Sequence, residues 1–257
     1  MRILILGSTG MLGNAVTRYF TPRYDITATT RTTFDALRDA PEILPSGFDY
    51  VINCIGVIKP FMTRDPAGAI VVNALFPWKL ADWCEQNSSR LIHITTDCVY
   101  SGKKGKYIET DAHDALDAYG KTKSLGECID RAMVLRTSII GEELHSGVSL
   151  LAWTKKQSGK TVGGYVNHLW NGVTTDTYAQ ICDAIIKRGL YEKGLFHIHA
   201  ADDVSKRDML ELFDRRFNLN LTIRDETPEP IDRTLRTEQK LCTELNIPTV
   251  GEMIDAL

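Results

Sequence analysis

Tyr119 and Lys123 are two residues whose types and spacing suit proton transfer. On a helix, residues i and i+4 share one face, so the phenol and the ammonium would lie close together. A free tyrosine has a pKa near ~10, and a neighbouring ammonium favours the phenolate and lowers that pKa. The same spacing also occurs on ordinary surface helices. The pair therefore indicates acid–base chemistry only if the surrounding elements place it beside a ligand.

A glycine-rich loop near the N-terminus predicts where such a ligand would bind. The loop follows an aliphatic strand at 2–6 and precedes a segment with helical spacing at 14–20. Glycines permit a tight turn and let backbone amides approach a pyrophosphate, which the N-terminus of a helix also attracts. The alternative is an ordinary strand-to-helix turn that needs glycine. We predict a dinucleotide-binding loop formed by Gly7, Ser8, Thr9, Gly10, Met11, Leu12 and Gly13.

The end of the second expected strand, 25–30, indicates which dinucleotide would bind. NAD-binding proteins usually carry Asp or Glu there for the ribose 2′-hydroxyl. This chain has Arg31 instead and no acid at that point. A guanidinium can form a fork with a 2′-phosphate, which favours NADP(H) over NAD. The alternative is an arginine that is simply solvated at the surface.

The rest of the first 140 residues alternates between strands and helices. Strands are expected at 48–55, 90–95 and 132–139, and helices at 67–87 and 119–130. Near-continuous apolar runs are typical of strands that are buried on both faces of a parallel sheet. Alternating elements imply right-handed crossovers, so we predict an α/β fold with a doubly wound, Rossmann-like parallel sheet.

Beyond about residue 141 the alternation becomes irregular. We expect helices at 146–160, 175–187 and 206–217, a strand at 195–200 and a break at 227–230. This pattern predicts two parts, a dinucleotide-binding domain at 1–160 and a small C-terminal substrate-binding lobe of mixed α/β structure at 161–257. Parts of the chain are expected to cross between them.

The composition of the 257 residues excludes several classes of protein. The net charge is −3, which argues against a general binder of nucleic acid or anionic membranes, because both need a basic surface. No apolar run approaches the ~18 residues of a membrane span. The six cysteines lie far apart without a Cys-x-x-Cys pair, and we interpret them as reduced thiols in the cytoplasm. His197 and His199 lack a sensibly spaced third ligand, so no metal site is expected.

Taken together, these motifs resemble a known family. A glycine loop spaced as Gly7, Gly10 and Gly13, followed by Tyr119 and Lys123, is the pattern of the extended short-chain dehydrogenases/reductases. More narrowly, the chain is similar to the dTDP-4-dehydrorhamnose reductase family. The similarity spans nearly the whole chain, is specific over residues 1–141 and is looser beyond them. It rests further on HITTDCVYSG at 93–102, YGKTK at 119–123, VLRTS at 134–138 and VNA at 72–74.

The resemblance implies a role for each catalytic residue. Tyr119 would donate a proton to the 4-keto oxygen of a nucleotide-activated deoxysugar, while NADPH delivers hydride to the carbon. Thr96 would hydrogen-bond that oxygen and stabilise its developing charge. Lys123 would tune Tyr119 and hold the nicotinamide ribose. The family also places a loop beside the cofactor after the third strand, here Asn53, Cys54, Ile55 and Gly56.

The substrate side is less well defined by the motifs. Thr96 and Asp97 are expected to contact the sugar, and Trp170 and Asn171 fall where the substrate lobe of the family begins. Arg233 and Arg236 could reach the diphosphate, although either could instead be an ordinary surface residue. Ile139 follows VLRTS where the family often has an aromatic residue, which leaves the identity of the sugar open.

Three functions are compatible with these motifs. The first is an NADPH-dependent 4-keto reductase; Cys98, where related dehydratases carry Glu, argues against water elimination. The second is a non-catalytic NADP-binding subunit that resembles the regulatory β subunit of methionine adenosyltransferase. The third is a nucleotide-sugar 4-epimerase, which would hold NAD tightly. The nucleotide, the product stereochemistry and the existence of a homodimer stay open.

Overall fold

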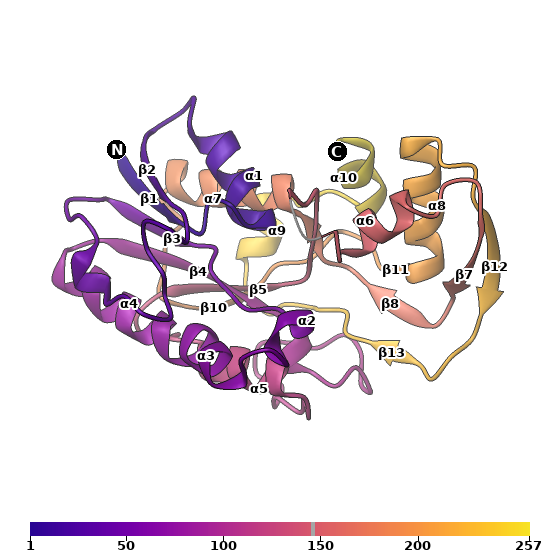
Figure 1. Cartoon of the computed structure of the whole chain (residues 1–257), viewed down its shortest axis with the longest axis horizontal. Helices are drawn as coiled ribbons and strands as arrows, with labels where there is room; N and C mark the ends of the chain where they lie inside the picture. Colours follow the sequence, from indigo (N-terminus) through magenta and orange to yellow (C-terminus); the bar gives the residue numbers. More distant parts are fainter. Residues whose placement is uncertain (145–146) are drawn as a thin grey trace.

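A six-stranded parallel sheet forms the centre of the molecule (Figure 1). The computed structural model describes residues 1–144 and 147–257. The strand order is β10-β5-β4-β3-β1-β2, and each neighbouring pair runs parallel. The strands are β1 (Arg2–Leu6), β2 (Asp25–Thr29), β3 (Tyr50–Asn53), β4 (Arg90–Thr96), β5 (Met133–Thr137) and β10 (Gly194–His197). The predicted doubly wound α/β fold is confirmed.

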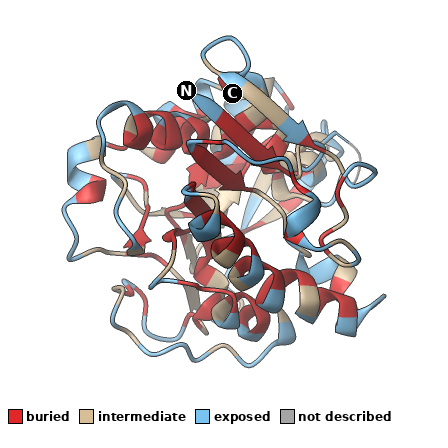
Figure 2. Ribbon diagram, turned by 90° about the vertical axis from the view of Figure 1, so that its left-hand side faces the viewer, coloured by how far each residue is buried: buried red, intermediate tan, exposed pale blue. Residues whose placement is uncertain are grey.

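Helices cover both faces of this sheet because successive side chains of a strand point to opposite sides. Ile3 and Ile5 belong to a core cluster shared with α1 (Met11–Phe20) and α7 (Thr175–Lys187). Leu4 and Leu6 belong to a second cluster, on the side of α4 (Phe76–Gln86). Figure 2 shows the resulting buried strands between helices whose outer faces are exposed.

The helix expected at 67–87 is a nearly continuous helical run with an irregular centre. It consists of α3 (Pro66–Ile70), a π-helical turn (Val71–Leu75) and α4. Pi-helical turns are rare in proteins, but many of those that occur lie at functional sites. The helix expected at 119–130 is shorter: α5 (Ala118–Leu125) begins at the cap Asp117, whose carboxylate accepts from the amide of Gly120 at 2.8 Å.

The chain also forms a smaller lobe beside the sheet domain (Figure 1). Its helix α8 (Lys206–Phe217) matches the helix expected at 206–217. The helix expected at 146–160 is α6 (Leu150–Lys155), and residue 146 lies outside the described residues. The lobe contains the three-stranded sheet β11 (Val204–Ser205), β8 (His168–Trp170) and β13 (Ile231–Asp232), the pair β7 (Thr161–Tyr165) and β12 (Thr222–Glu226), and α10 (Val250–Asp255). The remaining short elements are α2 (Lys59–Met62), β6 (Ile139–Ile140), β9 (Val173–Thr174) and α9 (Leu241–Leu245).

The chain crosses between the two parts more than once. After β8 it returns to the sheet domain, where α7 packs against α1 and β10 pairs with β5. It enters the lobe again at β11. A single cut at residue 160 therefore does not separate two continuous domains.

Within the described residues, no helix combines the length and the apolar character that a membrane span requires.

Candidate active site

A cavity of about 520 Å³ opens at the carboxyl ends of β1, β2 and β3. Crevices at this edge of a doubly wound sheet are the usual ligand sites of such folds. Several of the predicted cofactor-binding residues line it together: Gly7, Thr9, Gly10, Arg31, Cys54, Ile55 and Gly56.

The glycine loop at this cavity is built to bring backbone close to a ligand. Gly7 has a φ of +80°, a conformation that other residues rarely adopt. A Cβ on Gly13 would lie 2.0 Å from the carbonyl oxygen of Gly7, so this crossing of loop and helix requires glycine. Gly10 caps α1 without a side-chain hydrogen bond, and the first turn of the helix has no acidic residue. The amides and the positive end of α1 thus fit the pyrophosphate of a dinucleotide.

Arg31 lies at the exposed side of this cavity, with 78% of its side chain accessible. Its Nε is 3.5 Å from a carboxylate oxygen of Asp35, which also lines the cavity. Asp35 lies six positions beyond the end of β2, and its sequence position gave no sign that it would line the cavity. The same holds for the lining residues Phe34, Ala36, Leu37, Val57, Phe61, Arg64, Asp65, Gly68, Ala69 and Val72.

The loop after β3 is held by two buried asparagines. Asn53 accepts a hydrogen bond from the amide of Ile55 at 3.0 Å. Asn73, in the π-helical turn, binds both the amide and the carbonyl of Val57 at 2.8 Å. It also donates to the hydroxyl of Thr122 on α5 at 3.3 Å. Asn73 therefore connects the loop that lines the cavity to the helix that carries Tyr119. The VNA string was its only signal in the sequence.

The structure brings Thr96, Tyr119 and Lys123 together. Thr96 ends β4, and its hydroxyl accepts from the amide of Cys98 and donates to Asp97, both at 3.1 Å. The side chains of Tyr119 and Thr96 lie close enough to interact. Lys123, only 5% exposed, donates from its ammonium to the carbonyl of Ile94 at 3.0 Å.

Burial dominates the electrostatics of these groups. It raises the pKa of the Tyr119 phenol, as do Cys98 and Asp97, whereas the interaction with Thr96 lowers it. The expected lowering of this pKa by Lys123 is therefore wrong as a net effect. Burial also lowers the pKa of Lys123 to about 8, against the opposing charge of Glu127. At neutral pH the site holds a protonated phenol beside an ammonium, an arrangement that can donate a proton.

Cys98 is a half-buried thiol two residues after Thr96. Burial raises its pKa to about 12, as does the nearby charge of Asp97. A thiol with so high a pKa stays neutral near pH 7 and is a poor nucleophile.

Trp170 and Asn171, which were expected to contact substrate, have structural partners. Trp170 is buried in the main core cluster. The amide group of Asn171 donates to the carbonyl of Leu235 at 2.9 Å and accepts from its amide at 3.0 Å. It thereby attaches the segment after β13 to the end of β8. A direct contact of either side chain with a ligand stays a prediction.

The two predicted arginines differ in their surroundings. Arg236 forms an ion pair with Asp203, with the closer nitrogen–oxygen contact at 2.5 Å. Arg233 donates instead to the carbonyls of Tyr100 at 2.8 Å and Ser101 at 3.2 Å, directly after the Thr96 turn. Of the two, Arg233 has the guanidinium that is not paired with a carboxylate within the described part of the chain.

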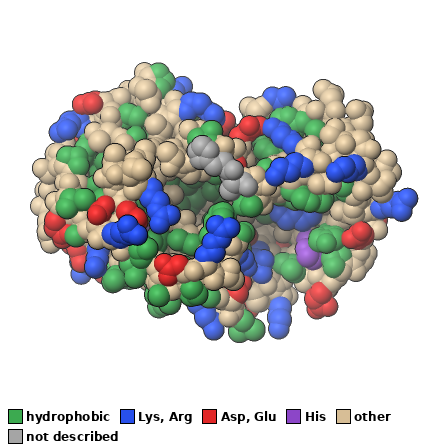
Figure 3. Space-filling view, viewed as in Figure 1, with side chains coloured by type: hydrophobic (Ala, Val, Ile, Leu, Met, Phe, Trp, Pro, Cys, Tyr) green, Lys and Arg blue, Asp and Glu red, His purple; other side chains and the backbone are tan. Residues whose placement is uncertain are grey.

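Lys206 is a further cation here that the sequence analysis missed. Its ammonium lies 5.5 Å from the centre of the Trp170 ring and 3.6 Å from the sulfur of Met209. Burial lowers its pKa, against the charge of Asp97. Among the described residues it forms no ion pair. Figure 3 shows Lys and Arg side chains beside the hollow between the two parts of the molecule.

The match to a family model decides the relationship of this chain to known proteins. The model described as RmlD substrate binding domain matches residues 1–238. The chain belongs to this RmlD family. One family relative is the dTDP-4-dehydrorhamnose reductase of Aggregatibacter actinomycetemcomitans, which is 27% identical over 83% of this chain and 78% of its own length.

Other similarities of this RmlD-family chain extend to a protein with a different name and to solved structures. Methionine adenosyltransferase 2 subunit beta of Danio rerio is 28% identical over 85% of this chain and 74% of its own length. The dTDP-4-dehydrorhamnose reductase of Bacillus anthracis, solved in complex with NADP, superimposes with a TM-score of 0.83. That comparison covers 99% of this chain and 97% of the other at 19% identity, which establishes a shared fold.

Proposed function

We propose that this protein is an NADPH-dependent reductase of the 4-keto group of a nucleotide-activated deoxysugar. The observation that carries the proposal is the meeting of Thr96, Tyr119 and Lys123 beside the cavity of the glycine loop. The dTDP-4-dehydrorhamnose reductases among the relatives support it.

On the cofactor side, backbone does most of the binding. The amides at the start of α1 would hold the pyrophosphate, and Arg31 would bind a 2′-phosphate at the open side of the cavity. Lys123 would hydrogen-bond the nicotinamide ribose. The nicotinamide, when bound, supplies the hydride. The residues Asn53 and Asn73 fix the loop at 54–57 that would contact the cofactor.

On the substrate side, the phenol of Tyr119 would donate its proton to the keto oxygen. The Thr96 hydroxyl would hydrogen-bond the same oxygen and stabilise the charge that develops on it. Lys206 and Arg233, which lack carboxylate partners among the described residues, would offer positive charge to the phosphates of the substrate. The wider surface cannot do this, because the net charge of the chain is −3.

The test is whether the protein oxidises NADPH in the presence of 4-keto-6-deoxy sugars activated by dTDP, GDP, UDP or CDP. The loss of nicotinamide absorbance measures the oxidation. We expect oxidation with one of these substrates and formation of the 4-hydroxy sugar in equal amount. Binding of NADPH without turnover of any of the four classes would refute the proposal. The Tyr119→Phe protein is the control for contaminating activity.

The similarity to the β subunits of methionine adenosyltransferase supports a second candidate, a regulatory NADP-binding subunit. This function would need the cofactor cavity but not proton transfer. Recovery of a stoichiometric enzyme partner, together with no ketosugar turnover, would favour it over the reductase.

A further inference from the structure

Arg136 lies inside the molecule with a fully buried side chain, on strand β5 of the six-stranded sheet. Burying a guanidinium is costly unless every charge and hydrogen-bond donor finds a partner. Neither the sequence motifs nor the proposed chemistry assigns this residue a role. Its surroundings are therefore informative about what the fold needs at this point.

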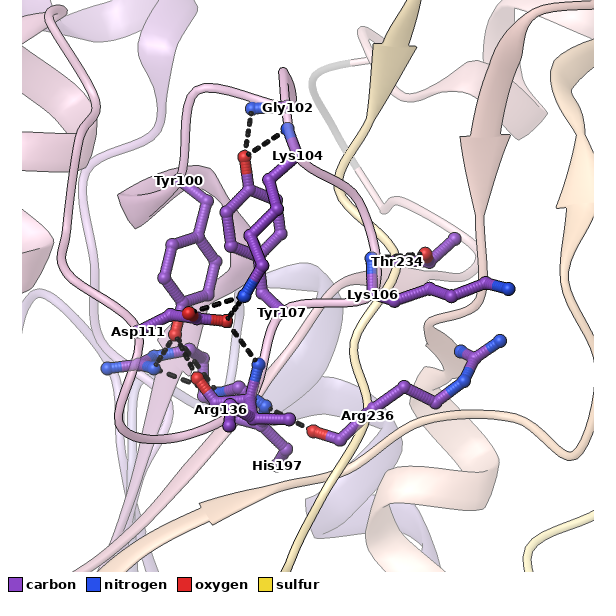
Figure 4. A network of polar contacts seen from close by, with 11 residues as sticks. Tyr100, Gly102, Lys104, Lys106, Tyr107, Asp111, Arg136, His197, Thr234 and Arg236 are labelled. Carbon is purple, nitrogen blue, oxygen red and sulfur yellow. Dashed lines mark hydrogen bonds and ion pairs between the residues drawn. The ribbon is translucent and has the colours of Figure 1, made fainter.

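All five N–H donors of Arg136 have acceptors, and Figure 4 shows the bonds to Tyr100 and His197. Nε and Nη2 donate to the two carboxylate oxygens of Glu127 at 3.0 and 2.5 Å. Nη1 donates to the hydroxyl of Tyr100 at 2.5 Å and to Nε2 of His197 at 2.8 Å. Nη2 also donates to Nε2 of His113 at 2.6 Å. Because a guanidinium cannot accept, both imidazoles accept and must be neutral.

These acceptors belong to the segments that carry the proposed catalytic residues. Tyr100 ends the short turn that begins at Thr96. Glu127 lies two residues beyond the end of α5. His113 reaches α5 through its other nitrogen, which lies 2.6 Å from the hydroxyl of Ser124, the neighbour of Lys123.

The same network extends to the C-terminal segment. Nδ1 of His197 lies 2.7 Å from the carbonyl of Arg236, so it donates the proton that Nε2 lacks. The ring of Tyr107 stacks on that of Tyr100 with centres 4.1 Å apart, and its carbonyl accepts from the amide of Arg236 at 2.7 Å. Figure 4 shows this segment crossing beside the buried guanidinium.

We propose that Arg136 is a positioning residue, which fixes the Thr96 turn and the Tyr119 helix relative to each other. It acts through Tyr100 on the turn, and through Glu127 and His113 on the helix. No side chain of this network lines the cofactor cavity. Its loss should therefore separate the two proton-handling groups and leave intact the glycine-loop side of the cofactor site, where most of the binding contacts are expected. The kinetic part of this proposal rests on the proposed reductase function.

Three variants test the network from different sides. Arg136→Lys keeps the positive charge but loses the two parallel hydrogen bonds to Glu127. Glu127→Gln removes the ion pair with Arg136. His113→Ala removes the contact with Ser124 at a partly exposed position. Arg131→Lys is the matched control, because Arg131 forms a surface ion pair with Asp82 outside the network. If Arg136→Lys does not fold, Glu127→Gln and His113→Ala still decide the question.

We expect kcat to fall about tenfold to a hundredfold in Arg136→Lys, since small displacements of reacting groups have effects of this size. The affinity for NADPH should stay within about twofold, and a smaller loss of kcat is expected for His113→Ala. In Glu127→Gln the alkaline limb of the kcat profile should move to lower pH, because the charge of Glu127 raises the pKa of Lys123. The Arg131→Lys control should match the wild type.

Amide hydrogen exchange provides a readout that does not depend on activity. We expect faster exchange at 97–100 and 119–125 in Arg136→Lys, and unchanged exchange at 3–13. If the wild type reduces no ketosugar, the reductase proposal fails, and the exchange data alone decide the role of Arg136. Unchanged kcat and exchange in all three variants would overturn the inference. So would a uniform loss of protection and of NADPH affinity, which would indicate a general structural role.

Discussion

The buried ammonium of Lys123 donates a hydrogen bond to the carbonyl of Ile94 on β4, at 3.0 Å. Because β4 ends in Thr96, this single contact joins the helix that carries Tyr119 to the strand that carries Thr96. The contact lies in a desolvated site, which explains why the pKa of Lys123 is lowered to about 8. The charge of Lys123 is therefore sensitive to pH in a range where the protein can be assayed.

The rate of ketosugar reduction should be level below about pH 8 and fall above it. Lys123 is an ammonium below its pKa of about 8 and loses that charge as pH rises through it. Tyr119 stays protonated across this range, because burial raises its pKa. Steady-state rates measured from pH 6 to 10 provide the check. In Lys123→Arg the falling limb should move to higher pH, and an unmoved limb would assign it to another group.

Tyr119→Phe should lower kcat by about a hundredfold to ten-thousandfold, the usual contribution of a positioned acid. Binding of NADPH should change by less than about twofold, because Tyr119 does not line the cavity of the glycine loop. Stopped-flow reduction and a fluorescence titration measure the two quantities. Tyr165→Phe, at an exposed tyrosine of the lobe, is the control. Full activity in Tyr119→Phe would assign proton donation to another residue.

Gly13→Ala and Gly10→Ala, two single substitutions in the same loop, should have different effects. A Cβ at Gly13 would lie 2.0 Å from the carbonyl of Gly7, so Gly13→Ala should lower the free energy of unfolding by about 1–3 kcal/mol. A Cβ at Gly10 meets nothing nearer than 3.4 Å, and this residue has an ordinary φ of −76°. Gly10→Ala should therefore fold normally but bind NADPH more weakly, because the methyl group lies at the N-terminus of α1.

Urea unfolding and NADPH titration of both variants separate these effects. Gly251→Ala serves as control, since its added Cβ would be 3.6 Å from the nearest atom. Equal stability of the Gly13→Ala and Gly10→Ala proteins would contradict the close approach of Gly7 and Gly13.

Arg31→Ala should weaken NADPH binding by about tenfold or more and leave NADH binding nearly unchanged. A guanidinium fork recognises the 2′-phosphate that only NADPH carries. Asp35→Asn should strengthen NADPH binding, because it removes a carboxylate 3.5 Å from Arg31. Dissociation constants for both cofactors are the measurement, with the exposed Arg38→Ala as control. A similar loss for NADH and NADPH would show that Arg31 does not select the cofactor.

The protein should lose stability in acid through the buried imidazole of His197. Burial and the charge of Arg136 lower its pKa from 6.5 to about 4. Since the folded state favours the neutral ring, the stabilisation is complete above about pH 6.5 and is lost as pH falls towards 4. A difference of this size corresponds to about 3 kcal/mol. The pKa of His113 is lowered in the same direction, chiefly by burial.

The free energy of unfolding in urea at pH 7.5, 6 and 5 measures this dependence. His197→Gln can accept from Arg136 and donate to the carbonyl of Arg236 without titrating. Its stability should therefore change less between pH 7.5 and 5 than that of the wild type. Parallel curves for the two proteins would assign the acid sensitivity to other groups.

Short-range patterns in the sequence determined the order of elements and the positions of the main site residues. Gly7, Gly10 and Gly13 lie directly between β1 and α1, so adjacent residues specify that turn. Tyr119 and Lys123 lie one helical turn apart, a spacing that the helix itself converts into proximity. Periodicity also identified α8 at its observed bounds. These features depend only on residues that lie close together in the sequence.

Only the tertiary structure decided which distant segments meet. β10 pairs with β5 across some sixty residues of intervening chain, and Asn171 binds Leu235, which lies 64 positions further along. The same applies to Asn73 on the cofactor loop, to Lys206 over Trp170 and to the five acceptors around Arg136. A polar residue in a sequence gives no sign of whether it will be solvated or surrounded by acceptors. The difference depends on strand order and packing, which also bury Tyr119 and thereby raise the pKa of its phenol.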